Sequence, residues 1–392
     1  MQTTEPKIKE IITLPDEFES FGDARREGFL KIKELKDQGI PVAGVFCTYS
    51  PLEIFNAAGM VTVGLCASSD ETIPEAEAHL PRNLCPLVKA SYGYALTNKC
   101  PYMHFSDLVV GETTCDGKKK MYELLGELKN VHVMQLPNNQ SAESRDQWYN
   151  EVLKLRDRVE SDFGVKITEE NLRDAIALKN QERLLMREVA DLSIQDPPPI
   201  SGVDQMKILY GTQFKFSFEQ KFSELRGAID KIQADYDAGV RNVPAGAKRI
   251  VLTGCPSGGA PEKVVKVIEE CGGVVVAFEN CTGAKQYENL VDETHEDPYR
   301  AISDRYLDIG CSVMSPDTKR YELLEELTTR FKADAVIEMT LQACHTYNIE
   351  TFNVKRKCES MGLPFISVET DYSQADIAQL KTRIGAFMEM IQ

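Results

Sequence analysis

The chain has 392 residues, of which 45 are Lys or Arg and 61 are Asp or Glu, so its formal net charge at pH 7 is -16. This acidic balance disfavours binding to nucleic acid or to an anionic membrane, because such binding needs a basic stripe that the sequence lacks. No apolar run reaches the roughly 18 residues that cross a bilayer, and the charged N-terminus lacks the apolar stretch of a signal peptide. We therefore expect a soluble cytoplasmic protein that binds neither nucleic acid nor membrane.

The predicted elements begin with a helical N-terminal segment, residues 1–41. Apolar residues recur at helical spacing from Phe21 to Leu35, and Gly39-Ile40-Pro41 ends the pattern. Short apolar runs and helical stretches then alternate, which predicts a first α/β domain over residues 42–143. Its first expected elements are a strand, a helix and a strand, at Val42–Phe46, Leu52–Ala58 and Met60–Leu65.

The middle of the chain, residues 144–246, reads as helical and holds none of the cysteines. A charged helical pattern covers about Ser144 to Gln195, is broken by Asp196-Pro197-Pro198-Pro199, and resumes from about Phe216 to Ala238. We interpret this segment as a helical platform or a dimerisation element.

A second α/β domain is predicted over residues 247–392, and it repeats the pattern of the first. Ile250–Gly254 is an apolar run that ends at Cys255, Val274–Phe278 leads to Cys281, and Asp334–Thr340 leads to Cys344. Alignment of the two halves pairs four cysteines of the first with four of the second: Cys47 with Cys255, Cys66 with Cys281, Cys85 with Cys311, and Cys115 with Cys344. The fold class is therefore expected to be α/β, with two similar doubly wound, Rossmann- or flavodoxin-like parallel-sheet domains facing a cleft.

Eleven cysteines without a CxxC pair are the main chemical signal in the sequence. Most of them follow a predicted strand, and the carboxyl ends of parallel strands point into the ligand crevice of such folds. Thiols gathered there indicate a buried metal or redox centre. An iron–sulfur cluster is favoured over zinc, because zinc sites are built on tight CxxC spacing; buried structural thiols are the alternative.

Individual contexts narrow the candidates. Cys115 precedes a predicted helix start, where the helix dipole and nearby lysines would stabilise a thiolate. Cys271 and Cys358 lie on helical stretches away from the crevice and are expected to be structural. The run Lys118 to Lys120 is interpreted as a solvated helix face. Acid–base candidates lie near predicted strand ends, with hydrogen bonding or helix capping as their alternative role: Glu112, His104, His345, Glu338 and Asp371.

One glycine-rich segment resembles a phosphate-binding loop. Gly254-Cys255-Pro256-Ser257-Gly258-Gly259 lacks the Lys-Ser/Thr ending of a Walker A sequence, so we do not expect ATP to bind there.

Four segments carry a resemblance to a known family. They are Cys47-Thr48-Tyr49-Ser50-Pro51-Leu52-Glu53, Leu80-Pro81-Arg82-Asn83-Leu84-Cys85-Pro86, Gly111-Glu112-Thr113-Thr114-Cys115-Asp116-Gly117-Lys118-Lys119 and Thr340-Leu341-Gln342-Ala343-Cys344-His345. Together they resemble the 2-hydroxyacyl-CoA dehydratase and benzoyl-CoA reductase family, and most closely its single-subunit branch, the double-cubane cluster proteins. The similarity extends from about Gly44 to the C-terminus and includes Glu369 to Ser373.

The resemblance implies a homodimer in which each chain carries a double-cubane [8Fe–9S] cluster and reduces a small molecule at low potential. It also implies a separate ATP-hydrolysing iron–sulfur activator protein as electron donor. The family's three-cysteine ligand set maps onto Cys85, Cys115 and Cys344. For the second cubane we expect Cys311, Cys47 and Cys281, with Cys66, Cys100 and Cys255 as substitutes. The alternatives are a dehydratase or reductase component with a single [4Fe–4S] cluster and a non-enzymatic iron–sulfur carrier.

Overall fold

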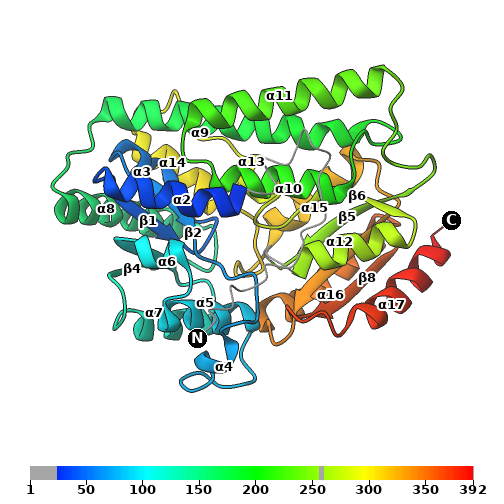
Figure 1. Cartoon of the computed structure of the whole chain (residues 1–392), viewed down its shortest axis with the longest axis horizontal. Coiled ribbons are helices and arrows are strands. Elements are labelled where there is room, and N and C mark those ends of the chain that lie inside the picture. The colour runs from blue at the N-terminus through cyan, green and yellow to red at the C-terminus, as the bar shows by residue number, and fades with distance from the viewer. Residues whose placement is uncertain (1–23, 256–259, 392) are drawn as a thin grey trace, which may run out of the picture.

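The computed structural model describes residues 24–255 and 260–391, and within them it contains two parallel sheets of four strands each (Figure 1). The first sheet has the order β2-β1-β3-β4 and the second the order β6-β5-β7-β8. The strands are β1 (Val42–Val45), β2 (Val61–Gly64), β3 (Leu108–Glu112), β4 (Val131–Met134), β5 (Lys248–Gly254), β6 (Gly273–Phe278), β7 (Ala335–Leu341) and β8 (Phe365–Thr370). The α/β fold class with two similar sheets is confirmed.

Helices surround both sheets. Those of the first half are α2 (Ala24–Asp37), α3 (Leu52–Ala57), α4 (Ile73–Ala76), α5 (Pro86–Thr97), α6 (Pro101–Phe105) and α7 (Asp116–Leu125). Those of the second half are α12 (Ala260–Glu270), α13 (Ala284–Tyr287), α14 (Pro298–Leu307), α15 (Thr318–Arg330), α16 (His345–Ser360) and α17 (Ile377–Met390). Between them lie α8 (Ala142–Phe163), α9 (Glu169–Asp191), α10 (Gly202–Gly211) and α11 (Phe218–Asp237), with two short 3-10 turns, η2 (Leu192–Ile194) and η3 (Thr212–Phe214).

The identical strand order of the two sheets supports an internal duplication. β1, β2 and β3 hold in the first sheet the positions that β5, β6 and β7 hold in the second. Cysteines follow all six of these strands, so the pairs found in the sequence occupy equivalent places: Cys47 and Cys255, Cys66 and Cys281, and Cys115 and Cys344. In each sheet the strand order reverses between the first and third strands of its half, and ligand crevices form outside the carboxyl ends at such a switch point.

The central helices connect the two halves. The helix α9 packs against α3 of the first half and against α13 and α14 of the second, and α8 also packs against α14. In Figure 1, α9 and α11 run along one side of the molecule past both sheets. The helical region predicted from Ser144 onward consists of two helices, because Gly164 adopts a left-handed φ of 64° and the Thr168 hydroxyl caps α9 by accepting from the Asn171 N–H.

The two halves share buried side chains. One continuous apolar cluster contains residues of β1, α8 and β5, among them Ala43, Trp148 and Ile250. Trp148 is fully buried, and its ring meets the ring of Tyr49 edge-on, with 6.4 Å between ring centroids. The domain boundaries given above therefore stay a prediction, since packing between the segments is continuous.

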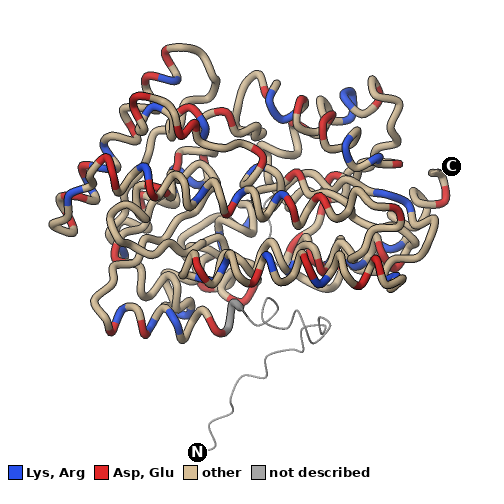
Figure 2. The backbone as a smooth tube through the Cα atoms, turned by 90° about the horizontal axis from the view of Figure 1, so that it is seen from above, with Lys and Arg blue, Asp and Glu red and all other residues tan. Residues whose placement is uncertain are grey.

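Positions of Lys or Arg and positions of Asp or Glu are interspersed along the backbone of the outer helices (Figure 2). Within the described part of the chain, no helix combines the length and the apolar character that a membrane span requires.

Trp148 tests how far α8 stabilises the first half. We expect Trp148→Ala to lower the free energy of unfolding by about 3 to 5 kcal/mol, because it opens a cavity in a core that all segments share. Urea unfolding followed by circular dichroism measures this. Leu128→Ala, at a side chain 42% exposed, is the control and should cost less than about 0.5 kcal/mol. Equal effects of the two changes would contradict the shared core.

Candidate functional site

The loops that follow the strands of both sheets meet around a cavity. Cys47, Cys66 and Cys281, which follow β1, β2 and β6, line one part of this cavity, whose volume is about 170 Å³. The arrangement follows from the topology, because the carboxyl ends of parallel strands lie at one edge of each sheet. Thiols from both halves of the chain are thereby brought together.

Three thiols form a first group, the Cys344 group, which consists of Cys85, Cys255 and Cys344. The Cys344 thiol is hydrogen-bonded to the other two thiols. The Leu341 N–H donates to Cys255 Sγ at 3.2 Å. The hydrogen bond from Cys344, followed by burial, raises the pKa of Cys85 well above its usual value. The hydrogen bond with Cys255, together with burial, likewise raises the pKa of Cys344.

Backbone geometry sets the positions of this group. Cys85 and Cys344 are the N-cap residues of α5 and α16, so the free N–H groups of a helix start point towards each thiol. Gly254, just before Cys255, has a φ of 118°, and a Cβ there would collide with the Met339 carbonyl. A glycine is therefore required for the close approach of β5 to β7 that brings Cys255 to Cys344.

A second group, the Cys281 group, consists of Cys47, Cys281 and Cys311. Burial raises the pKa of Cys47 well above its usual value; Lys118 opposes this effect, and Cys281 and Cys311 add to it. Tyr49, two residues after Cys47, donates to the carbonyl of Ile309, two residues before Cys311, at 2.7 Å. This buried hydrogen bond holds the loops of Cys47 and Cys311 against each other.

Two buried lysines accompany the Cys281 group. Lys118 Nζ donates to the Phe46 carbonyl at 3.3 Å. Lys285 Nζ lies 2.9 Å from Glu279 Oε1 and donates at 3.0 Å to the Tyr347 hydroxyl, which in turn lies 3.7 Å from Cys311 Sγ. Positive charge of this kind stabilises thiolates and metal–thiolate groups.

The remaining cysteines lie around or away from these groups. Cys66 donates to the Phe46 carbonyl at 2.9 Å and lines, together with Cys100, a smaller cavity. Cys115 is the N-cap of α7 and interacts with the charge of Lys118. Cys271 and Cys358 lie apart from both groups, the latter fully buried in the apolar core.

The first turn of α7 nevertheless lies close to the Cys85 loop. A Cβ built on Gly117, two residues after Cys115, would sit 3.0 Å from the side chain of Leu84. Cys115 therefore lies in a loop that borders the Cys344 group.

The acid–base candidates are placed differently from one another. Glu112 is fully buried and accepts a short hydrogen bond from the Ser50 hydroxyl. Its charge acts on the thiols of Cys47 and Cys66. Burial raises the pKa of Glu112 to about 7. Glu338 is buried and paired with Arg320 at 3.2 Å. The other three lie further out. His104 bonds Asn98 at the surface, His345 is exposed at the start of α16, and Asp371 accepts from the Ser373 N–H at 2.8 Å.

Sequence reasoning missed several residues. The interpretation of Lys118 as part of a solvated helix face is wrong, because this residue is only 8% exposed. The solvated lysines of this run are Lys119 and Lys120. The helical period could have found it, because Lys118 shares a face with Met121, Tyr122 and Leu125. Lys285 and the cations of α9 and α14 gave no comparable signal.

The donor set fits an iron–sulfur cluster better than a single metal ion. Across residues 24–255 and 260–391, no three side chains of His, Cys, Asp or Glu converge on one point as ligands of one ion would. A cubane makes a different demand, since each thiolate binds a different iron atom. Two groups of three thiols each, which are buried or partly buried, meet that demand.

Comparisons with known proteins match most of the chain. A family model described as "2-hydroxyglutaryl-CoA dehydratase, D-component" matches residues 47–391. A protein of Escherichia coli (strain K12), YjiM, whose name describes it provisionally as a dehydratase subunit, is 51% identical over 97% of this chain and 99% of its own length.

More distant relatives have named reactions. The (R)-phenyllactyl-CoA dehydratase beta subunit of Clostridium sporogenes is 24% identical over 92% of this chain and 94% of its own. One of the benzoyl-CoA reductase subunits of Thauera aromatica is 24% identical over 88% of this chain and 89% of its own.

Glu112 makes stability depend on pH. The pKa of Glu112 is about 7 in the folded chain and about 4.5 when the side chain is exposed. The free energy of unfolding therefore falls as pH rises from 4.5 to 7, by up to about 3 kcal/mol. Glu112→Gln, which mimics the protonated acid, should therefore be more stable than the parent chain at pH 8 and close to it at pH 5. Urea unfolding at both values measures this, with Glu123→Gln, at an exposed side chain of α7, as control. A gain that is equal at both pH values would contradict the raised pKa.

Proposed function

This chain belongs to the 2-hydroxyglutaryl-CoA dehydratase D-component family, and we propose that it is a low-potential reductase of small molecules with a double-cubane [8Fe–9S] cluster. The resemblance found in the sequence is confirmed at the level of the family. Membership supports iron–sulfur-dependent dehydration or reduction of a radical type. The two groups of thiols are the single observation that carries the finer proposal.

Each group would hold one cubane. For the Cys281 group the proposed ligands are Cys47, Cys281 and Cys311. For the other cubane the proposed ligands are Cys85, Cys344 and a third cysteine. The family resemblance implies Cys115 as this third ligand. Cys255, which contacts Cys344, is the alternative. The duplication supports two sites, because the alignment of the two halves pairs cysteines of one group with cysteines of the other. Cys85 pairs with Cys311, and Cys255 pairs with Cys47.

The cluster would supply electrons of low potential, one at a time. The residues of this chain would shield the thiols, stabilise their ionised form and supply a proton. Full or partial burial limits the access of water to the thiols, while Lys118, Lys285 and the helix N-termini of α5, α7 and α16 favour their ionised form. Glu112 holds a proton up to about pH 7, and its partner Ser50 lines the cavity, so this pair can deliver a proton to a substrate there. The roles of His104, His345, Glu338 and Asp371 stay predictions.

We further propose two partners: an ATP-hydrolysing iron–sulfur activator and a second copy of the chain. The relatives are named as subunits of their enzymes, which supports partner proteins in general. The segment that resembles a phosphate loop, at residues 256–259, lies outside the described residues; its sequence lacks the Walker A lysine. A cytoplasmic location is supported by the eleven cysteines, which are all free.

The names of the relatives favour a second candidate function. As a dehydratase component, the chain would hold one [4Fe–4S] cluster on Cys85, Cys115 and Cys344, and act on a 2-hydroxyacyl-CoA. An iron–sulfur carrier is disfavoured, because Cys255 and Cys311 are buried and the other four thiols of the two groups are only partly exposed, unlike the ligands of the exposed cluster that transfer requires.

Iron content separates the two enzymatic readings. We expect about eight iron atoms per chain, purified without oxygen, because two cubanes contain that number. Cys47→Ser should lower the iron content by about half or more, since it removes a ligand of the Cys281 group. Cys358→Ser, in the apolar core, is the matched control and should change nothing. About four irons in the parent chain, undiminished in Cys47→Ser, would favour the dehydratase reading.

The electron donor tests the partner. Because a buried thiolate-bound cluster has a low potential, substrate reduction with ferredoxin should require both ATP and a second protein. A strong artificial reductant such as titanium(III) supplies the driving force itself and should make both unnecessary. Turnover by the purified chain with ferredoxin alone, without ATP, would contradict the proposed activator.

A further inference from the structure

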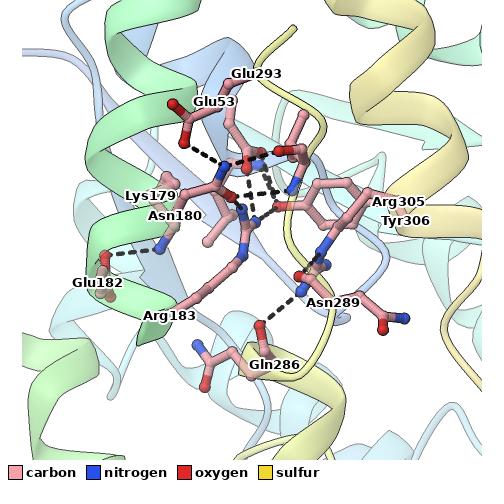
Figure 3. Close-up of polar contacts among 12 residues, drawn as sticks. Glu53, Lys179, Asn180, Glu182, Arg183, Gln286, Asn289, Glu293, Arg305 and Tyr306 are labelled. Carbon is pink, nitrogen blue, oxygen red and sulfur yellow. Dashed lines mark hydrogen bonds and ion pairs between the residues drawn. The ribbon is translucent and has the colours of Figure 1, made fainter. Parts of the chain in front are cut away.

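The cavity beside the thiols has a second, basic end. Four cationic side chains define this end, which we call the basic pocket: Lys179 and Arg183 of α9, Lys221 of α11 and Arg305 of α14. Figure 3 shows Lys179, Arg183 and Arg305 together with the groups that they contact. Cys47, Cys66 and Cys281 line the same cavity.

The carboxylates near the basic pocket are already engaged. Glu53 accepts from Arg183 Nη2 at 2.6 Å and from the Tyr306 hydroxyl at 2.9 Å. Glu182 is shared between Lys179 at 2.8 Å and Lys221 at 3.0 Å. Four cations thus face two carboxylates, and the excess positive charge stays uncompensated.

Arg305 is the clearest part of this imbalance. Its side chain is buried, and its guanidinium donates to two backbone carbonyls, those of Gln286 at 2.6 Å and Asn289 at 2.9 Å. Among the described residues, no carboxylate lies within ion-pair distance of this guanidinium. Glu53 acts on the charge of Arg305, but its two oxygens already accept hydrogen bonds from Arg183 and Tyr306. A buried arginine that shares its counter-ion with a second arginine is costly, so this site is suited to a further negative ligand.

The excess charge is separate from the positive charge that faces the thiols. Lys118 and Lys285 interact with cysteines, whereas the charged or ionisable neighbours of Arg305 are Arg183, Tyr306 and Glu53. Burial and the nearby Arg183 lower the pKa of Arg305 to about 10, and burial lowers that of Lys179 to about 8. Burial is the main cause of both shifts, and a bound anion would oppose it by favouring the charged forms.

We propose that the basic pocket binds the carboxylate of a small organic acid and that the rest of this molecule extends towards the thiols at the other end of the cavity. The inference rests on the proposed function and specifies its substrate class. A planar guanidinium matches a carboxylate through paired hydrogen bonds. A cavity of about 170 Å³ is smaller than the roughly 300 to 1,000 Å³ that hold drug-sized ligands, so the body of a coenzyme A ester would lie outside it.

The test compares a carboxylate with its neutral counterpart. Propionate and propionamide have nearly the same shape, and only the first is charged. Calorimetric titration of the full chain, purified with its iron, should give saturable binding of propionate, with propionamide at least about tenfold weaker. Inorganic phosphate is titrated in parallel. Binding of phosphate but not of propionate would overturn the assignment to a carboxylate, as would equal affinity for propionate and propionamide.

Variants locate the site. Arg305→Gln should weaken propionate binding about tenfold or more, because it removes the guanidinium and its charge. Lys221→Gln, nearer the edge of the pocket, should weaken it less and guards against a folding defect in the first variant. Arg300→Gln is the matched control on the same helix: this arginine pairs with Asp146 and Asp304 and does not line the cavity, so affinity should stay within about twofold.

Iron content keeps this inference distinct from the proposed function. We expect Arg305→Gln to keep the iron content of the parent chain while it loses propionate binding. If the variant loses iron and binds propionate unchanged, then the excess charge serves the cluster and the inference is wrong. An iron-loaded parent chain that binds no propionate would overturn the inference and leave the proposed function standing.

Discussion

The buried carboxylate of Glu53 holds three segments of the chain together. Glu53 lies on α3, six residues after Cys47, and accepts hydrogen bonds from Arg183 of the central helix α9 and from Tyr306 of α14 in the second half (Figure 3). Burial alone would raise the pKa of Glu53, but Arg183, Arg305 and Lys179 together hold it below its usual value. Loss of one partner in such a buried pair typically costs about 3 to 5 kcal/mol, since the other charge stays buried without compensation. The relative position of the two halves, and with it the spacing of the thiols, depends on this contact.

A second constraint fixes the loops that carry the thiols. Tyr49 bonds the Ile309 carbonyl at 2.7 Å, and Tyr372 bonds the Ala67 carbonyl at 3.0 Å. Each hydrogen bond joins a residue one or two positions after a cysteine of the first half, Tyr49 or Ala67, to a segment of the second half. Both tyrosines are buried, so these bonds are shielded from water. A cluster bound between the halves would thus have ligands held by tertiary contacts rather than by a local motif.

The sequence was informative where a short-range pattern carried the signal. The runs at Val42–Phe46 and Ile250–Gly254 correspond to β1 and β5 within two residues, because a buried parallel strand is apolar throughout and turns mark its ends. The cysteines that follow the strands could be found for the same reason. Their division into two groups could not, since it depends on the contact of Cys344 with Cys85 and Cys255 across the two halves.

The basic pocket shows why the remaining site residues could not be predicted from the sequence. Lys179 and Arg183 stand one helical turn apart on α9, and a charged pair at this spacing is typical of a solvated helix face. Only the packing of α9 against α3, α13 and α14 shows that this face is buried. A charge pattern alone cannot distinguish a platform helix from one wall of a binding cavity, because in both cases the helix carries a polar and an apolar stripe.

The distribution of charge over the molecule gives the cavity its selectivity. With a net charge of -16 the exterior repels anions at long range, while the cavity carries uncompensated positive charge at one end and two lysines beside the thiols at the other. A thiolate-bound cluster is itself negative, and a carboxylate a few ångströms away would be repelled by it, by about 4 kcal/mol at 4 Å for unit charges near a protein surface. The cations on both sides reduce that repulsion. With the proposed cluster in place, an anionic substrate would thus bind where its charge is compensated and where its reacting end could approach the cluster.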